Sequence, residues 1–253
     1  MKLLKSSVLS IFVISFLFNQ TVFAVPVFQV YIEDAVAGTV GPDEDTWFTT
    51  SSSFSLIVAG AYGPDTESLT DVTLVLSVPQ DETGSICITG GDGAALLAEQ
   101  YVTDDGLYNP GGDAVIDLLT NEPGNPQGYD GYTDKSFLPD GVEFNNHYPF
   151  KADVSDFLLY GIGDFDNISY AVSNYSTDEA ISYNIADGQE KTYAVSIDGF
   201  SSVHFDVYGY EKTNKCEGTW KINPGSHDAT MVPEPATCFL LALGSVVFLR
   251  KRR

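Results

Sequence analysis

The stretch ISYNIADGQEKTYAVSIDGFSSVHFDV, residues 181–207, decides the fold class. Apolar or aromatic residues occupy every second position in three successive runs, Ile181–Ile185, Tyr193–Ile197 and Val203–Val207. Asp187-Gly188 and Asp198-Gly199 separate the runs, and Asp-Gly is a strong hairpin signal. This period of two predicts β-strands joined by tight turns into an antiparallel meander.

The same periodicity recurs on both sides of this stretch, in Phe28–Ile32, Phe54–Val58, Val72–Val78, Ile86–Thr89 and Trp220–Ile222. Residues 94–102 fit a short helix, and residues 104–150 form a long segment rich in Gly, Pro, Asn and Asp. Short strands separated by turns predict an all-β fold, an antiparallel, jelly-roll-like β-sandwich over residues 25–222. Residues 223–231 fit a linker that follows this domain.

The N-terminus has the pattern of a secretory signal peptide. Lys2 and Lys5 give a basic start, Val8–Phe18 is an apolar core, and Val22-Phe23-Ala24 is a suitable cleavage site. The alternative is a retained membrane anchor, but an apolar core of about ten residues is too short for ~30 Å of hydrocarbon. We therefore expect residues 1–24 to be a signal peptide cleaved after Ala24.

The C-terminus has three parts in order: a Pro-Glu-Pro motif, the apolar segment 236–249 and a basic cluster. As a helix the apolar segment is about 21 Å long, which is short for a bilayer. The terminal cations favour a cytoplasmic end by the positive-inside rule. The pattern predicts a short hydrophobic helix that passes through the membrane and serves as a sorting signal.

Residues 232–253 resemble the PEP-CTERM sorting tail. The residues that carry this resemblance are Pro233, Glu234, Pro235, Arg250, Lys251, Arg252 and Arg253. The resemblance implies recognition by an exosortase, a membrane-held precursor, and export to the surface or matrix of a Gram-negative bacterium that makes exopolysaccharide. The same tail description is attached to some ice-binding proteins. We do not expect ice binding, because Thr49–Ser53 is too short for a threonine array and has no repeat.

The body of the chain is similar to the choice-of-anchor surface proteins, in particular the N-type group. The similar segments are Val30–Glu33, Tyr160–Asp164, His204–Gly209 and Lys221–Ser226. In those families one exported domain occurs with different C-terminal anchors. The resemblance implies no activity.

Charge limits the classes of partner. The chain has a net charge of −23, and residues 25–232 hold 34 acidic side chains against six lysines and no arginine. Such a surface repels phosphate groups, so nucleic acid is excluded as a partner. The acidic surface is typical of a protein that stays soluble in a salty or calcium-containing exterior. The alternative explanation of the acidic residues is a specific cation site.

Calcium is the one cofactor that the sequence suggests. Candidate ligand sets are Asp164, Asp166 and Asn167, the segment Asp104–Gly106, and the segment Asp130–Asp134. Calcium takes six to eight oxygen ligands, which clustered carboxylates supply. The alternative is that these residues only form turns through bonds from side chain to backbone.

Catalysis is not expected. The chain has no Gly-x-Ser-x-Gly elbow, no His-Glu-x-x-His and no glycine-rich phosphate loop. His147, His204 and His227 stand alone in the sequence, and the alternation around His204 turns it to solvent or to the opposite face of its sheet. Cys87 and Cys216 form a candidate disulfide in an oxidising compartment, with free thiols as the alternative.

These observations lead to one favoured function and two alternatives. We expect a non-catalytic exported protein of the cell envelope or exopolysaccharide matrix, sorted through its tail. The first alternative is an adhesive module that binds calcium or carbohydrate. Aromatic residues of the long middle segment, Tyr129, Tyr132, Tyr148 and Phe150, would then contact sugar rather than pin the segment to the core. The second alternative, a polysaccharide-active enzyme, is the least favoured.

Overall fold

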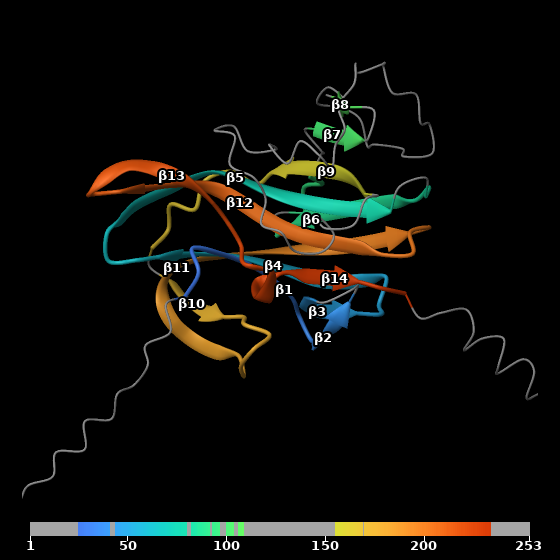
Figure 1. Ribbon diagram of the computed structural model, residues 1–253, viewed down its shortest axis with the longest axis horizontal. Helices are drawn as coiled ribbons and strands as arrows, with labels where there is room; N and C mark the ends of the chain where they lie inside the picture. Colours follow the sequence, from blue (N-terminus) through green and yellow to red (C-terminus); the bar gives the residue numbers. More distant parts are fainter. Residues whose placement is uncertain are drawn as a thin grey trace, which may run out of the picture.

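The structure, a computed structural model, describes residues 25–40, 44–79, 82–91, 93–96, 100–103, 106–108, 155–168 and 170–233. The predicted signal peptide and the sorting tail beyond Pro233 lie outside these ranges. The described chain is almost entirely strand, arranged in two layers (Figure 1). None of its helical segments is long and apolar enough to cross a membrane.

Sheet A contains five strands. Its main path runs in the order β1 (Phe28–Ile32), β4 (Ser53–Tyr62), β11 (Ser182–Asp198) and β10 (Tyr170–Asn174), and β6 (Ser85–Gly90) pairs with the far end of β11. All of these pairings are antiparallel.

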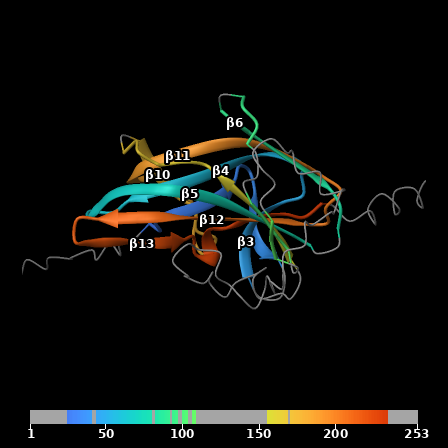
Figure 2. The ribbon, with the colours of Figure 1, turned by 90° about the horizontal axis from the view of Figure 1, so that it is seen from above.

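Sheet B contains nine strands around the central strand β12 (Val203–Thr213), which pairs with β5 (Thr66–Pro79), β13 (Cys216–Ile222) and β14 (Ala229–Met231). Beyond β5 lie β9 (Ser155–Gly161), β7 (Gln100–Thr103) and β8 (Gly106–Tyr108). Beyond β14 lie β3 (Glu44–Thr49) and β2 (Val36–Val40). The pair β3 and β14 is parallel, so sheet B is mixed. The long strands β5, β11 and β12 run along the long axis of the domain (Figure 2).

The core lies between the two sheets, because each long strand turns alternate residues inward. Val203, Phe205 and Val207 of β12 belong to the same buried cluster as Leu56 and Val58 of β4. Burial of such side chains, at roughly 25 cal/mol per Å² of apolar surface, is the main force that holds the layers together. The predicted all-β sandwich is confirmed.

One predicted turn is wrong and the other is confirmed. Strand β11 continues through Asp187-Gly188, where these two residues pair with Tyr62 and Ala61 of β4. A Cβ atom on Gly188 would collide with the carbonyl oxygen of Gly60, so this glycine allows two strands to approach closely. Asp198-Gly199 does end the strand, and Gly199 has a φ of +87°.

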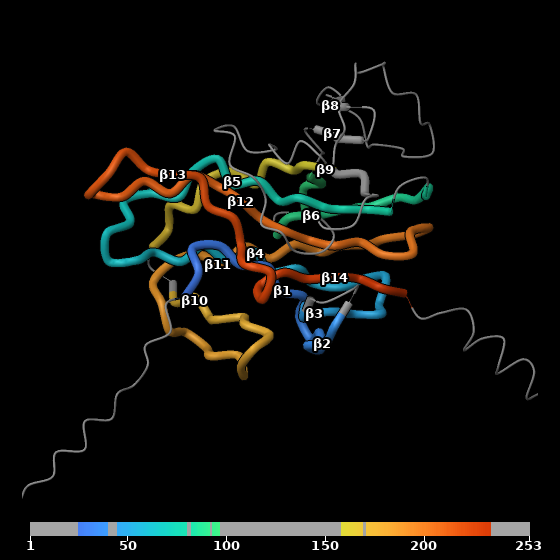
Figure 3. The backbone as a smooth tube through the Cα atoms, viewed as in Figure 1, coloured from blue at the N-terminus to red at the C-terminus, as the bar shows by residue number. Residues whose placement is uncertain are grey.

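Two other segments differ from the sequence analysis. No helix forms over the described part of residues 94–102, because Gln100–Thr103 is strand β7. Residues 223–231, assigned to a linker, contain a 3-10 turn, η2 (Gly225–His227), and strand β14. Figure 3 shows β14 lying against β1 and β3 rather than outside the domain. The folded domain therefore extends at least to Met231.

Polar bonds also join the sheets. The indole nitrogen of Trp47 on β3 donates to the carbonyl oxygen of Tyr175, which follows β10, at 2.7 Å. The imidazole of His227 in η2 has Nε2 2.9 Å from Oδ1 of Asn174 on β10, and Nδ1 2.9 Å from Oγ of Ser226. A neutral ring satisfies both contacts, since Nε2–H donates to Asn174 and Nδ1 accepts from Ser226.

We predict that His227 makes the protein less stable as the pH falls from 6.5 to about 4. Burial lowers the pKa of His227 from 6.5 to about 4, and the charge of Asp178 only partly opposes this shift. Between these two pH values, His227 is protonated in the unfolded chain but neutral in the folded chain. The full stabilisation is therefore present only above pH 6.5.

The measurement is urea unfolding of the wild type and of His227→Gln at several pH values. Many carboxylates also titrate in this range, so the difference between the two proteins isolates the histidine. A shallower pH dependence in the variant is expected. Parallel curves for the two proteins would contradict the prediction.

Candidate functional site

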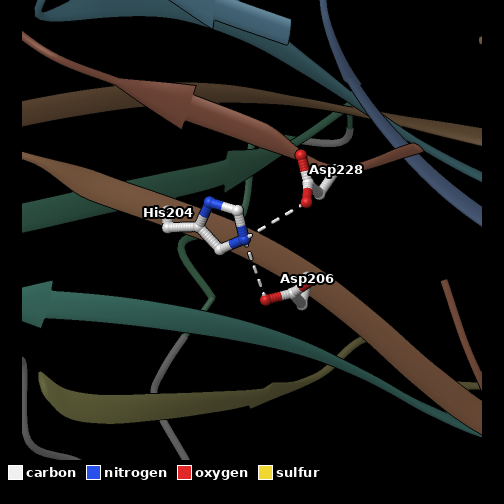
Figure 4. Close-up of side chains that lie close together, drawn as sticks. All are labelled: His204, Asp206 and Asp228. Carbon is white, nitrogen blue, oxygen red and sulfur yellow. Dashed lines mark ion pairs between the residues drawn. The ribbon is translucent and has the colours of Figure 1, made fainter. Parts of the chain in front are cut away.

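Three buried ionisable side chains meet on the outer face of sheet B. His204 and Asp206 lie two residues apart on β12, and Asp228 lies between η2 and β14 (Figure 4). Their neighbours Phe205 and Ala229 point into the core, so alternation turns the three side chains away from sheet A. They are nevertheless buried, with 3% of His204 and none of Asp206 or Asp228 exposed.

The imidazole of His204 is the centre of this group, which we call the His204 cluster (His204, Asp206 and Asp228). Its Nε2 lies 3.1 Å from Oδ2 of Asp206 and 3.6 Å from Oδ2 of Asp228. Its Nδ1 lies 2.7 Å from Oγ1 of Thr230 on β14. Both ring nitrogens are therefore engaged, one by a hydroxyl and the other by two carboxylates.

Neighbouring side chains fix the orientation of the cluster. Oδ1 of Asp206 accepts a bond of 3.0 Å from Nδ2 of Asn223. The amide of Asn223 is itself held, because its Oδ1 accepts from the backbone N–H of Val207 at 2.7 Å. Oγ1 of Thr230 also lies 3.3 Å from Oγ1 of Thr46 on β3. These bonds restrict the rotation of the His204 and Asp206 side chains.

The order Thr230, His204, Asp206 has the connectivity of a hydroxyl, an imidazole and a carboxylate in a hydrolytic triad. A nucleophile must reach its substrate, whereas Thr230 is fully buried. An imidazole nitrogen facing two carboxylates can instead hold a proton or a metal cation. The arrangement therefore suits cation binding better than nucleophilic catalysis.

Asp206 and Asp228 lie beside His204, so the prediction that this histidine stands alone is wrong. The alternation did place His204 on the face opposite its apolar neighbours, which the structure confirms. Asp206, Asp228 and Thr230 were missed. His204-x-Asp206 on a strand puts two metal-binding side chains on one face, and this spacing was the available signal. The approach of Asp228 depends on the return of β14 beside β12, which no local pattern reveals.

The predicted calcium ligands Asp164, Asp166 and Asn167 lie in the loop between β9 and β10, where a lysine supplies a positive charge. Nζ of Lys191 on β11 donates to the carbonyl oxygens of Ile162 at 2.6 Å and Asp164 at 2.8 Å. It also lies 4.5 Å from the centre of the Phe165 ring. Burial lowers the pKa of Lys191, and the charges of Asp166 and Asp164 oppose this effect.

Asp164 has a further role in this loop. Its Oδ1 accepts a bond of 3.0 Å from the backbone N–H of Asp71, a residue whose φ is +52°. The backbone N–H of Asn167 donates to Oε1 of Gln189 at 3.2 Å. Both bonds tie the loop to residues distant in the sequence and neither closes a local turn, so calcium binding at this loop stays a prediction.

Cys87 and Cys216 are both exposed free thiols in the structure. Cys87 lies on β6 of sheet A, whereas Cys216 begins β13 of sheet B, so the fold does not bring them together as a disulfide. The other candidates lie outside the described residues or have no described side chain: Ala24, Asp104–Gly106, Tyr129, Asp130–Asp134, Tyr132, His147, Tyr148, Phe150, Glu234, Pro235 and Arg250–Arg253.

A groove of about 640 Å³ lies on the outer face of sheet B, where β5, β9 and β12 meet β13. Among its lining residues are Tyr208, Trp220, Asp71 and Asp164. The half-buried ring of Trp220 packs edge-on against Tyr208, with ring centres 5.9 Å apart, and against Tyr210 at 5.4 Å. The C–H groups of a sugar pack on aromatic rings, and its hydroxyl groups hydrogen-bond to carboxylates. A groove that offers both kinds of side chain is therefore chemically suited to a sugar.

We predict that Lys191→Met lowers the free energy of unfolding by about 1–3 kcal/mol, because the carbonyl oxygens of Ile162 and Asp164 lose a charged donor. The matched control is Lys212→Met, since Lys212 is 56% exposed and pairs only with the exposed Glu67 among the described side chains. Urea unfolding of the two variants is the measurement. Equal stability of the two variants would show that Lys191 does not hold the loop.

Comparisons with known proteins identify the tail. The model of the PEP-CTERM protein-sorting motif matches residues 232–253. No curated protein matches the chain.

Two solved structures illustrate the structural similarities. The collagen binding subdomain of the Enterococcus faecalis surface protein ACE is 6% identical, with a TM-score of 0.22, and the match covers 83% of this chain and 99% of that one. The C terminal domain of the Streptococcus agalactiae AgI/II polypeptide BspA is 10% identical, with a TM-score of 0.20 and coverages of 78% and 49%. TM-scores of this size do not establish a shared fold. What is established is that the chain carries a PEP-CTERM sorting motif at residues 232–253.

Proposed function

We propose that this protein is a non-catalytic component of the cell envelope or exopolysaccharide matrix. The PEP-CTERM motif carries this proposal, because it implies an exported precursor that passes the membrane, is processed by an exosortase and is then sorted to the cell surface. The acidic charge of the body supports the proposal, since it keeps copies apart and soluble outside the cell.

The burial of the His204 cluster and of Thr230 suits a structural role. In the described part of the chain, the side chains with triad-like connectivity are fully buried in the middle of sheet B. Their contacts join β12 to β14, which are paired strands of that sheet. A domain of this kind contributes shape, charge and stability to the surface on which it is displayed.

We expect replacement of Pro233-Glu234-Pro235 by three alanines to leave an uncleaved, membrane-held precursor. Proline disfavours a helix, whereas three alanines would favour a helical segment that the enzyme does not recognise. The measurement is the intact mass and the membrane fraction of the protein recovered from the producing cells. The matched control is Pro224→Ala, because Pro224 lies ahead of η2 and outside the motif. Normal processing of the triple variant would refute the sorting role.

A second candidate function is carbohydrate binding, which the groove beside Trp220 favours. The indole is held by Tyr208 and Tyr210, so little conformational entropy is lost when a sugar packs on it. Asp71 and Asp164 supply acceptors for hydroxyl groups at the rim. The ligand would be a neutral glycan, because the surface repels anionic polymers.

We predict that Trp220→Ala weakens binding of the protein to the matrix polysaccharide of the producing cells at least tenfold, because the stacking surface is lost. The control is Tyr183→Ala, which removes an aromatic ring that is 69% exposed on β11 of the other sheet. Co-sedimentation with the isolated polysaccharide measures both variants. Undiminished binding by Trp220→Ala would exclude this groove as the site.

A further inference from the structure

We propose that the His204 cluster binds one divalent transition-metal ion of the zinc class, through Nε2 of His204 and one carboxylate oxygen each from Asp206 and Asp228. The three ligand atoms lie within 4.8 Å of one another. The ion would join the central strand β12 to the residue just ahead of β14. The site is distinct from the loop of Asp164, and its ligand chemistry is not that of calcium.

The donor set selects the class of metal. Calcium takes six to eight oxygen ligands, and three protein side chains of which one is an imidazole are a poor match for it. One imidazole nitrogen with two carboxylate oxygens suits zinc, and three protein ligands leave a fourth position for water. Manganese or iron would bind the same donors more weakly than zinc, by the general order of affinities.

The distances within the cluster match the edges of a small coordination shell. Ligands at about 2.0–2.2 Å from a tetrahedral zinc ion lie roughly 3.3–3.5 Å from one another. The separations from Nε2 of His204 are 3.1 Å to Asp206 and 3.6 Å to Asp228, which bracket this range. The carboxylate oxygens of Asp206 and Asp228 lie within 4.8 Å of one another, and a cation between them would draw them together.

The surroundings orient the ligands as a metal site requires. With the proton of His204 on Nδ1, the ring donates to Oγ1 of Thr230, and Nε2 presents its lone pair to the position between the carboxylates. Asn223 holds Oδ1 of Asp206, which leaves Oδ2 turned toward the same position. Metal-binding histidines and carboxylates are regularly held by such outer hydrogen bonds.

A second, independent observation comes from the neighbouring strand. Ser77 of β5 stands directly opposite His204 in the antiparallel register, so its side chain lies on the same face. It is 3% exposed, and within the described structure its hydroxyl has no hydrogen-bond partner. Buried hydroxyl groups rarely lack a hydrogen-bond partner. A water bound at the fourth position of the metal would supply the partner for Ser77.

Electrostatics also favours a cation. The carboxylates of Asp206 and Asp228 are fully buried within 3.6 Å of one imidazole. Buried carboxylates are stabilised by positive charge close to them, and a divalent cation between the two aspartates would supply it. A divalent ion balances both carboxylates and leaves His204 neutral.

The experiment measures the metal content and melting temperature of the purified full-length protein. We expect about one zinc per chain by mass spectrometry after reconstitution. A chelator should remove it, and zinc at a hundred times its Kd should raise the melting temperature of the metal-free protein by about 5–10 °C. Calcium at the same concentration should not restore the melting temperature, whereas cobalt should give the visible absorption of a tetrahedral site.

Matched variants locate the site. Asp206→Asn and His204→Gln should abolish stoichiometric zinc, while Asp164→Asn, a change of the same kind outside the cluster, should retain it. Thr230→Val should weaken zinc binding by about 10–100-fold, because the ring loses its orienting partner, and Thr230→Ser should restore it. Melting curves of the wild-type protein with and without chelator test the proposal even where a variant does not fold.

Three results would overturn the proposal. One is a wild-type protein that binds no zinc, manganese or iron and melts at the same temperature with and without chelator. Another is a zinc stoichiometry that Asp206→Asn leaves unchanged. The third is a melting temperature that calcium restores as well as zinc does, since this would indicate an oxygen site elsewhere on the acidic surface.

Discussion

The two-sided burial of strand β12 is the constraint on which the rest of the domain depends. Val203, Phe205 and Val207 face sheet A and form part of the core, whereas His204 and Asp206 face the other way and are buried too. One face is held by apolar contact and the other by charge and hydrogen bonds. A strand with two buried faces tolerates little change in register, because a slip of one residue would move the histidine and the aspartate into the core and the apolar side chains out of it.

The polar face of β12 also explains how the end of the domain is attached. β14 has three residues, and such a short strand has few ladder bonds of its own. Its position is fixed by parallel pairing with β3, by antiparallel pairing with β12 and by the contacts of Thr230 and Asp228 with His204. Asn223 and His227 add bonds from the segment just before it. The residues that look like a linker in the sequence are thus among the most buried polar residues in the described structure.

The sequence predicted the fold class because alternation reports which residues of a strand share a face. It misjudged Asp187-Gly188, since a glycine that admits a close neighbour and a glycine that forms a turn have the same local signature. Clustered acidic residues make the loop of Asp164 one of three candidate calcium sites, and no local pattern reveals that Lys191, distant in the sequence, donates to this loop. The His204 cluster needs two strands and a turn from separate segments, and only the pairing of β12 with β14 brings them into contact. The tail could be identified from sequence because its parts are contiguous.

The parallel pairing of β3 and β14 has a mechanical consequence. The chain leaves β14 at Met231, and the sorting motif begins at the next residue. A pull along the axis of β14 would load its ladder bonds to β3 and β12 in shear, all at once, because those bonds run across the strand. Strands peeled from an end release their bonds one at a time, whereas strands pulled lengthwise resist together. A force directed along β14 therefore meets the stronger of these two geometries.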